Sequence, residues 1–243
     1  MRPSLAALTI VLVAFGLARP AAAQDVDLEL VLLADATGSI DDAEIRFQRQ
    51  GYAEAITDPT VVAAIRSTAY GRIAVTYVEW ASVLSQDVVV GWTVVEDEAS
   101  ARAFAEALLV PPRRARGPNA IGAALLFGKG LIEGNDIDGF RKVIDLSADS
   151  AANSNGPPIE FARDEVVAAG ITINGLAVLC RHCSGRPIAY DLEQAFADRL
   201  IGGPGAFVIT ADNPDTFADA VRRKLILEIA GQRTGRDFAG AVD

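Results

Sequence analysis

Residues 28–45 constrain the fold more than any other part of the sequence. An apolar run over residues 28–34, broken by one charge, leads into the polar pentapeptide Asp35-Ala36-Thr37-Gly38-Ser39. A helical pattern then starts at Asp41. This order of apolar run, short polar turn and helix is typical of the first strand of a buried parallel sheet. We therefore expect an α/β fold with Asp35 at the carboxyl end of its first strand.

The rest of the chain alternates between helical and strand-like patterns. Helices are predicted over residues 41–56, 61–67, 100–110, 120–132, 159–169, 191–200 and 213–230. Further strands are predicted over residues 72–80, 86–95, 142–147, 171–179 and 206–210. The second and third strands are close enough in sequence to form a hairpin, which places an antiparallel strand at the sheet edge. We predict a doubly wound, mostly parallel six-stranded sheet with helices on both faces.

Residues 1–23 have the layout of a signal peptide. Arg2 gives a positive start, residues 5–17 are apolar, and three alanines precede the expected cleavage after Ala23. One domain is predicted over residues 24–230, followed by a flexible tail over residues 231–243. No second apolar run is long enough to span a membrane. We expect an exported protein, periplasmic or secreted.

The charge of the chain excludes some classes of partner. The net charge is −10, and it becomes −12 without the leader, which holds two arginines and no acids. Nucleic acids and anionic membranes both require basic surfaces, so neither is an expected partner. Arg113-Arg114-Ala115-Arg116 is a basic exception. We expect a solvated loop there, with internal ion pairing or an acidic ligand close to the site as alternatives.

Several polar residues are predicted to meet at the carboxyl edge of the sheet. If the fourth strand lies beside the first, Asp149 emerges next to Asp35. The loop that contains Asn119 lies over the same edge, and Thr37 and Ser39 add two hydroxyl groups. These hard oxygen donors suit Mg²⁺, Mn²⁺ or Ca²⁺. We therefore consider these five residues as candidate metal ligands.

Helix capping is the alternative for some of these residues. An aspartate turn after a strand can satisfy the N–H groups of the following helix, and Asn119 could cap the helix that starts at residue 120. Asp41 and Asp42 are predicted to be acids of the first helical turn, where they complement the helix dipole, and not ligands.

The same residues resemble the metal-ion-dependent adhesion site of von Willebrand factor A-type domains, which include integrin I domains. Asp35-Ala36-Thr37-Gly38-Ser39 matches the D-x-S-x-S element with one threonine for serine. Asp149 stands where the family has Thr-Asp-Gly, with Ser150 replacing the glycine, and Asn119 stands where the family has a threonine. The resemblance extends over residues 27–230 and is greatest to small exported bacterial members. It implies a divalent ion, Mg²⁺ first, that binds a carboxylate of a protein partner.

Cys180-Arg181-His182-Cys183 allows two interpretations. In an exported protein the two cysteines are expected to be oxidised. They could form a thiol–disulfide exchange site or a structural disulfide. Redox motifs of this spacing usually begin a helix, whereas Gly185 and Pro187 precede any helix here. We favour a structural disulfide between Cys180 and Cys183.

We do not expect an enzyme. Phosphatases of the haloacid-dehalogenase type also place an aspartate after the first strand, but they need a second aspartate at the position that Thr37 occupies. His182 is the only histidine, so no Ser-His-Asp arrangement is convincing. The remaining alternative to a metal-dependent binding module is an interaction scaffold that needs no metal.

Overall fold

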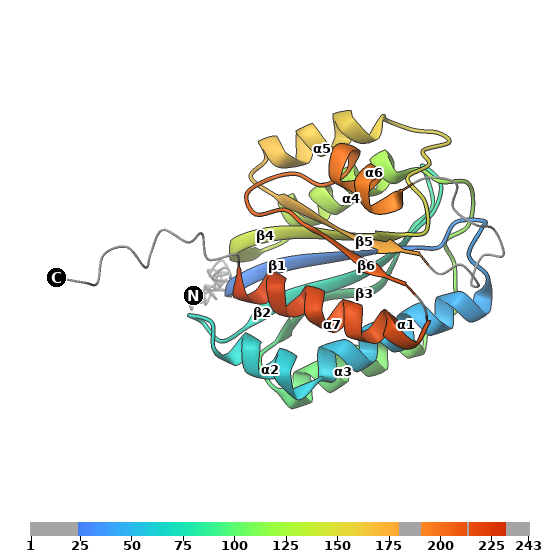
Figure 1. Cartoon of the computed structure of the whole chain (residues 1–243). Helices are drawn as coiled ribbons and strands as arrows, with labels where there is room; N and C mark the ends of the chain where they lie inside the picture. The colour runs from blue at the N-terminus through green and yellow to red at the C-terminus, as the bar shows by residue number, and fades with distance from the viewer. Residues whose placement is uncertain (1–23, 180–190, 213, 232–243) are drawn as a thin grey trace, which may run out of the picture.

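The computed structural model describes residues 24–179, 191–212 and 214–231 (Figure 1). The strands are β1 (Gln24–Asp35), β2 (Ile73–Trp80), β3 (Gln86–Val95), β4 (Ile137–Ala148), β5 (Thr172–Val178) and β6 (Val208–Ala211). The helices are α1 (Asp42–Thr57), α2 (Pro59–Arg66), α3 (Glu98–Leu109), α4 (Ile121–Glu133), α5 (Ile159–Ala168), α6 (Leu192–Arg199) and α7 (Pro214–Ala230). Strands and helices alternate along the chain except for the pairs α1–α2, β2–β3 and α3–α4, as the sequence pattern predicts.

These strands form one six-stranded sheet in the order β3-β2-β1-β4-β5-β6. Every neighbouring pair is parallel except β2 and β3, so β3 is an antiparallel edge strand. The predicted fold class is therefore confirmed. Both β1 and β4 start earlier than predicted, because Gln24 pairs with Ile137 in a polar stretch that carries no apolar pattern.

Helices cover both faces of the sheet (Figure 1). Successive side chains of a strand point to opposite faces. Leu30 and Leu32 of β1 accordingly pack into a core with residues of α1, α2, α3 and α7. Val31 and Leu33 pack into a second core with residues of α4, α5 and α6. Each such aliphatic side chain contributes about 1.5–3 kcal/mol on burial, so the alternation in β1 fixes its register.

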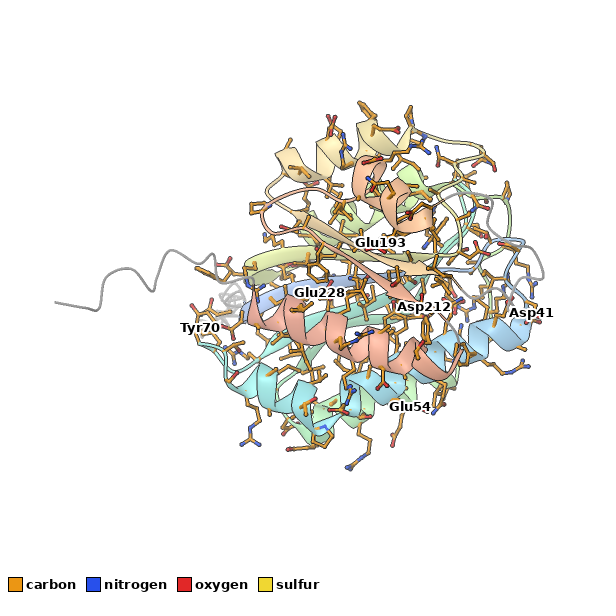
Figure 2. All side chains as sticks on the ribbon, viewed as in Figure 1. Asp41, Glu54, Tyr70, Glu193, Asp212 and Glu228 are labelled. Atoms are coloured by element: carbon orange, nitrogen blue, oxygen red, sulfur yellow. The ribbon has the colours of Figure 1, made fainter. Side chains whose placement is uncertain are left out.

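The carboxyl ends of the parallel strands meet at one edge of the molecule. The chain leaves β1 for β2 on one side, while β4 lies on the other side of β1, which makes this point a topological switch. Ala34 pairs with Ser147, so the residues that follow β1 and β4 leave the sheet side by side. Figure 2 labels Asp41 at this end and Tyr70 at the opposite end.

Four acidic side chains in the interior have a cationic partner. These pairs are Arg49–Glu79 at 2.7 Å, Lys224–Asp145 at 2.7 Å, Lys224–Glu228 at 2.6 Å and Lys142–Glu29 at 3.6 Å. Asp27 has hydrogen bonds instead, from the Thr68 hydroxyl and the Tyr70 amide. Because a buried charge without a partner is strongly unfavourable, these contacts allow the acids to remain inside.

Some predicted features lie outside the described residues. They are the signal peptide over residues 1–23, the pair Cys180 and Cys183, the helix cap Asn213, and residues 232–243 of the tail. Among the residues that the structure does describe, none of the helices is both long and apolar enough to cross a membrane.

Candidate metal centre

The loop after β1 presents oxygen atoms from three alternate residues. Asp35 ends the strand and is only 1% exposed, and its Oδ1 accepts the N–H of Thr37 at 2.8 Å. The hydroxyl oxygens of Thr37 and Ser39 lie 3.2 Å apart. A turn closed by the Ile40 N–H and the Thr37 carbonyl at 3.1 Å holds the loop compact. Thr37 is buried and Ser39 is exposed, so the three groups lie between the core and solvent.

Asp149 brings a second carboxylate to this loop. It follows the last residue of β4, next to β1, as predicted. One carboxylate oxygen of each aspartate, Asp35 Oδ2 and Asp149 Oδ1, is buried and has no hydrogen-bond partner. Two carboxylates with unsatisfied oxygens therefore lie at the end of neighbouring strands.

The pKa values of both aspartates reflect this arrangement. Burial, and then the charge of Asp149, raise the pKa of Asp35 to about 7, and hydrogen bonds from Thr37 and the Asp149 backbone offset this only in part. Burial also raises the pKa of Asp149, although hydrogen bonds from Ser39 and Ser150 act in the opposite direction. No cation among the described residues neutralises the pair, and a bound cation would favour the ionised form of both.

Asn119 reaches the site from the loop before α4. Its side-chain Nδ2 donates to the Ser150 hydroxyl at 2.9 Å. The residue at the N-cap of α4 is Ala120, whose side chain makes no cap hydrogen bond, and the Gly122 N–H donates instead to Asn153 Oδ1 at 3.2 Å. The capping alternative for Asn119 is therefore wrong. Ser150 stands where the von Willebrand factor A-type pattern has a glycine, and it links Asn119 to the Asp149 loop. The sequence gives no signal for this role.

The Arg113 side chain binds backbone carbonyls of the loop after β1. Its guanidinium donates to the carbonyls of Ala36 at 2.7 Å, Thr37 at 3.1 Å and Ile40 at 2.7 Å. Further hydrogen bonds from it reach the Ala115 carbonyl and the Asp42 carboxylate. The side chain is only 8% exposed, so the predicted solvated loop is wrong for Arg113. The internal ion pair that was the alternative is present.

A contact between Gly38 and Gly117 joins the loop after β1 to the loop before α4. The N–H of Gly38 donates to the carbonyl of Gly117 at 2.9 Å. Gly117 has a φ of +132°, and a Cβ there would lie 2.8 Å from the Cβ of Ser82. A residue with a side chain would both strain the backbone and clash, so glycine is required at this crossing. The crossing fixes the Asn119 loop over the aspartates.

Asp41 and Asp42 begin α1 and do not join the site. Asp41 is the N-cap residue, and its side chain accepts from the N–H groups of Ala43 and Glu44. The Glu44 carboxylate accepts from the Asp41 N–H at 2.7 Å, which completes a capping box. Asp42 lies in the first turn, as predicted. The capping box places Glu44 near the site, where burial and then the charges of Asp41 and Asp149 raise its pKa.

The donor set fits a hard divalent cation. It contains two carboxylates, two hydroxyls and an amide from the loops around Asp35, Asp149 and Asn119. No group of three or more histidine, cysteine or acidic side chains arranged for a metal occurs in the described part of the chain. Mg²⁺ usually takes one or two carboxylates and keeps several waters, so a site with two carboxylates and hydroxyls suits it. Asp35 and Asp149 would provide the charge, and Thr37 and Ser39 the neutral oxygens.

Solved structures share this fold. The pilus adhesin SpaC from Lactobacillus rhamnosus GG has a TM-score of 0.60 and 13% identity, and the match covers 84% of this chain and 31% of that one. A von Willebrand factor type A protein from Catenulispora acidiphila has a TM-score of 0.54 and 18% identity, over 84% and 43%. Proximal thread matrix protein 1 from the mussel byssus, with a zinc-occupied MIDAS motif, has a TM-score of 0.56 and 17% identity, over 86% and 49%.

The match spans less than half the length of each of these three proteins. At these identities the likeness shows the fold alone, which is that of a von Willebrand factor A-type domain, and it confirms the expected resemblance. No curated protein sequence matches the chain. One family model matches residues 25–233, and the chain belongs to that family, described as Protein of unknown function (DUF1194).

Proposed function

We propose that this protein is a divalent-metal-dependent protein-binding module. An ion held by Asp35 and Asp149, with the hydroxyls of Thr37 and Ser39, would keep one coordination position for a carboxylate of the partner. The ion would supply charge and a directional bond to that carboxylate. The protein's own residues hold the two carboxylates in place, exclude water from Asp35, and orient the loop through Arg113.

One observation carries this proposal. The interior acids Glu29, Glu79, Asp145 and Glu228 each have a lysine or arginine partner. Asp35 is as deeply buried as they are, yet within the described residues no cation pairs with it. Instead, burial and then the charge of the Asp149 carboxylate raise its pKa. The fold pairs these four acids with cations and gives Asp27 hydrogen bonds, whereas no described cation pairs with Asp35 or Asp149. A cation from solvent would neutralise this pair.

The names of two similar structures support a metal-dependent adhesion module. One is called a pilus adhesin, and another is described with a zinc-occupied MIDAS motif. Mg²⁺ is the first candidate for this chain because the donors are all oxygens, with Mn²⁺ and Ca²⁺ as alternatives. The metal and the partner protein stay proposals, as does the absence of catalysis.

Calorimetric titration of Mg²⁺, Mn²⁺ and Ca²⁺ into the protein tests the proposal. Saturable binding is expected for the wild type, and Asp35→Ala should abolish it. Asp138→Ala is the matched control, since it removes an exposed acid from the opposite end of β4 and changes the net charge equally. It should bind like the wild type. Absence of binding in the wild type, or equal binding by Asp35→Ala, would leave only the metal-independent scaffold.

Export is part of the same proposal. The predicted cleavage after Ala23 would release the domain outside the cytoplasm, where an adhesion-type module meets its partners. Sequencing the amino terminus of protein from the periplasmic and secreted fractions should give Gln24. An amino terminus at Met1 in every fraction would contradict the predicted signal peptide.

A further inference from the structure

A pocket rich in arginine lies beside the candidate metal centre. It has a volume of about 520 Å³ and is formed by α1 and the loop after α3. The pocket is lined by one acid, Asp42, and by four arginines, which are Arg46, Arg49, Arg113 and Arg116. Arg113 connects the two sites, because it lines the pocket and also bonds the carbonyls of Ala36 and Thr37 in the metal loop.

Only part of the positive charge in this pocket is neutralised. Arg49 pairs with the buried Glu79, but its Nη2 is buried and has no hydrogen-bond partner. Asp42 is shared, at 3.1 Å from Arg113 and 3.5 Å from Arg116. Arg46 is exposed and forms no salt bridge within the described ranges, although its charge interacts with that of Asp41 at the start of α1. A positive excess remains on a chain whose net charge is −10.

Exposed apolar side chains occur at the pocket and on two segments next to it. Leu109 lines it, and the adjacent Val110 is 82% exposed. Leu84 is 96% exposed in the loop between β2 and β3. This loop is tied to the pocket by a hydrogen bond from the Arg116 N–H to the Ser85 hydroxyl at 3.0 Å. Arginine together with exposed apolar groups is typical of a protein-binding surface.

We infer that this pocket binds an acidic segment of the partner protein, adjacent to the carboxylate that the metal receives. The inference rests on the proposed function for its partner, but the pocket's own chemistry requires no metal. Guanidinium groups recognise carboxylates by paired hydrogen bonds, and Arg46 and Arg116 have N–H groups free for them. The segment would carry at least two acidic residues with an apolar neighbour. One carboxylate would bind the arginines of the pocket, and the other would bind the ion.

Binding of a fluorescein-labelled hexaglutamate peptide, followed by fluorescence anisotropy, tests the pocket. The titration is made with chelator and again with Mg²⁺, and a labelled hexaglutamine peptide measures non-specific binding. With chelator, the double variant Arg46→Glu, Arg116→Glu should bind hexaglutamate about tenfold or more weakly. Asp42→Asn should bind it more tightly, because it frees the two arginines that Asp42 contacts.

Arg114→Glu is the matched control. Arg114 belongs to the same loop and is exposed, but it does not line the pocket and lies 3.7 Å from Asp87. It should keep affinity within about twofold. If Arg114→Glu and the double variant lost equal affinity for hexaglutamate, the proposed role of the pocket would be refuted. Binding of hexaglutamine as tight as that of hexaglutamate would also refute it.

The two proposals fail separately in this experiment. If hexaglutamate binds through Arg46 and Arg116 with chelator but Mg²⁺ adds no affinity, the pocket stands and the metal-bridged function fails. If calorimetry shows Mg²⁺ binding while the double variant binds hexaglutamate like the wild type, the metal site stands and the pocket is refuted. Asp35→Ala should remove only the part of the affinity that depends on Mg²⁺.

Discussion

Replacement of Asp35 by asparagine should stabilise the metal-free protein while abolishing metal binding. Asparagine keeps the shape of the side chain, and its carbonyl oxygen can accept the Thr37 N–H that Asp35 Oδ1 accepts at 2.8 Å. Its NH₂ group takes the place of the unpartnered Oδ2 and can donate to Asp149 Oδ1, which also lacks a partner. One charge of a repelling pair is removed without a cavity, and the Thr37 N–H keeps its acceptor.

The magnitude follows from the pKa of Asp35. Burial and Asp149 raise it from 3.8 to about 7 in the folded protein. The folded state therefore keeps a proton that the unfolded chain loses, so the stability that Asp35 contributes is lost as pH rises from about 4 to about 7. Each pKa unit corresponds to about 1.36 kcal/mol, so the full difference approaches roughly 4 kcal/mol. We expect Asp35→Asn to raise the free energy of unfolding by about 2–4 kcal/mol near pH 8, and by less than half of that near pH 5.

Urea unfolding in the presence of chelator measures this gain near both pH values. Asp27→Asn is the matched control, since Asp27 is also a buried aspartate of β1. Burial raises the pKa of Asp27, but hydrogen bonds from Thr68 and the Tyr70 backbone lower it by more. That variant should therefore lose stability near pH 8. A gain in Asp35→Asn that is the same at both pH values, or a loss near pH 8, would refute the charge-repulsion explanation.

Mg²⁺ at a hundred times its Kd should raise the free energy of unfolding of the wild type by about 2.7 kcal/mol in the same urea assay; an unchanged midpoint would contradict the site. Arg113→Ala should lower stability by about 2–4 kcal/mol and weaken Mg²⁺ in calorimetry, because buried carbonyls of the metal loop lose their donor. Lys224→Met should destabilise by about 3–5 kcal/mol, since Asp145 loses the cation 2.7 Å away; a neutral effect would show that Asp145 is protonated. Gly122→Ala should cost about 1–3 kcal/mol by thermal unfolding, because its Cβ would clash with the Pro157 carbonyl oxygen.

Local patterns predict the sheet because successive side chains of β1 point to opposite faces and are apolar on both faces. Leu30 and Leu32 enter one core and Val31 and Leu33 the other, so the run can only be a strand covered on both sides. Helix starts follow equally local chemistry, as the capping box at the start of α1 does. The first four residues of β1 escape prediction because their pairing with β4 depends on a segment more than a hundred residues away.

In the candidate site, too, local sequence predicts some residues and misses others. Asp35 and Asp149 are predicted together because both follow buried strands, and the topology brings the strand ends to one edge. Arg113 is missed because nothing in its neighbourhood indicates that its guanidinium reaches carbonyls 73–77 positions earlier in the chain. The role of Ser150 as the partner of Asn119 likewise depends on a contact between two loops. Contacts of this kind are properties of the assembled fold and not of either segment.

Arg113 explains how a cation can lie so close to Asp35 without neutralising it. A guanidinium has five N–H donors, and those of Arg113 bond backbone carbonyls, among them those of Ala36 and Ile40, and the Asp42 carboxylate. Its charge is therefore used to hold the loop, and Oδ2 of Asp35 and Oδ1 of Asp149 remain without a partner among the described residues. A divalent ion would balance the charge of these two carboxylates, and its open coordination position would take a carboxylate of the partner. Such a partner would meet the arginine pocket next to the ion, so the two sites favour the same acidic surface.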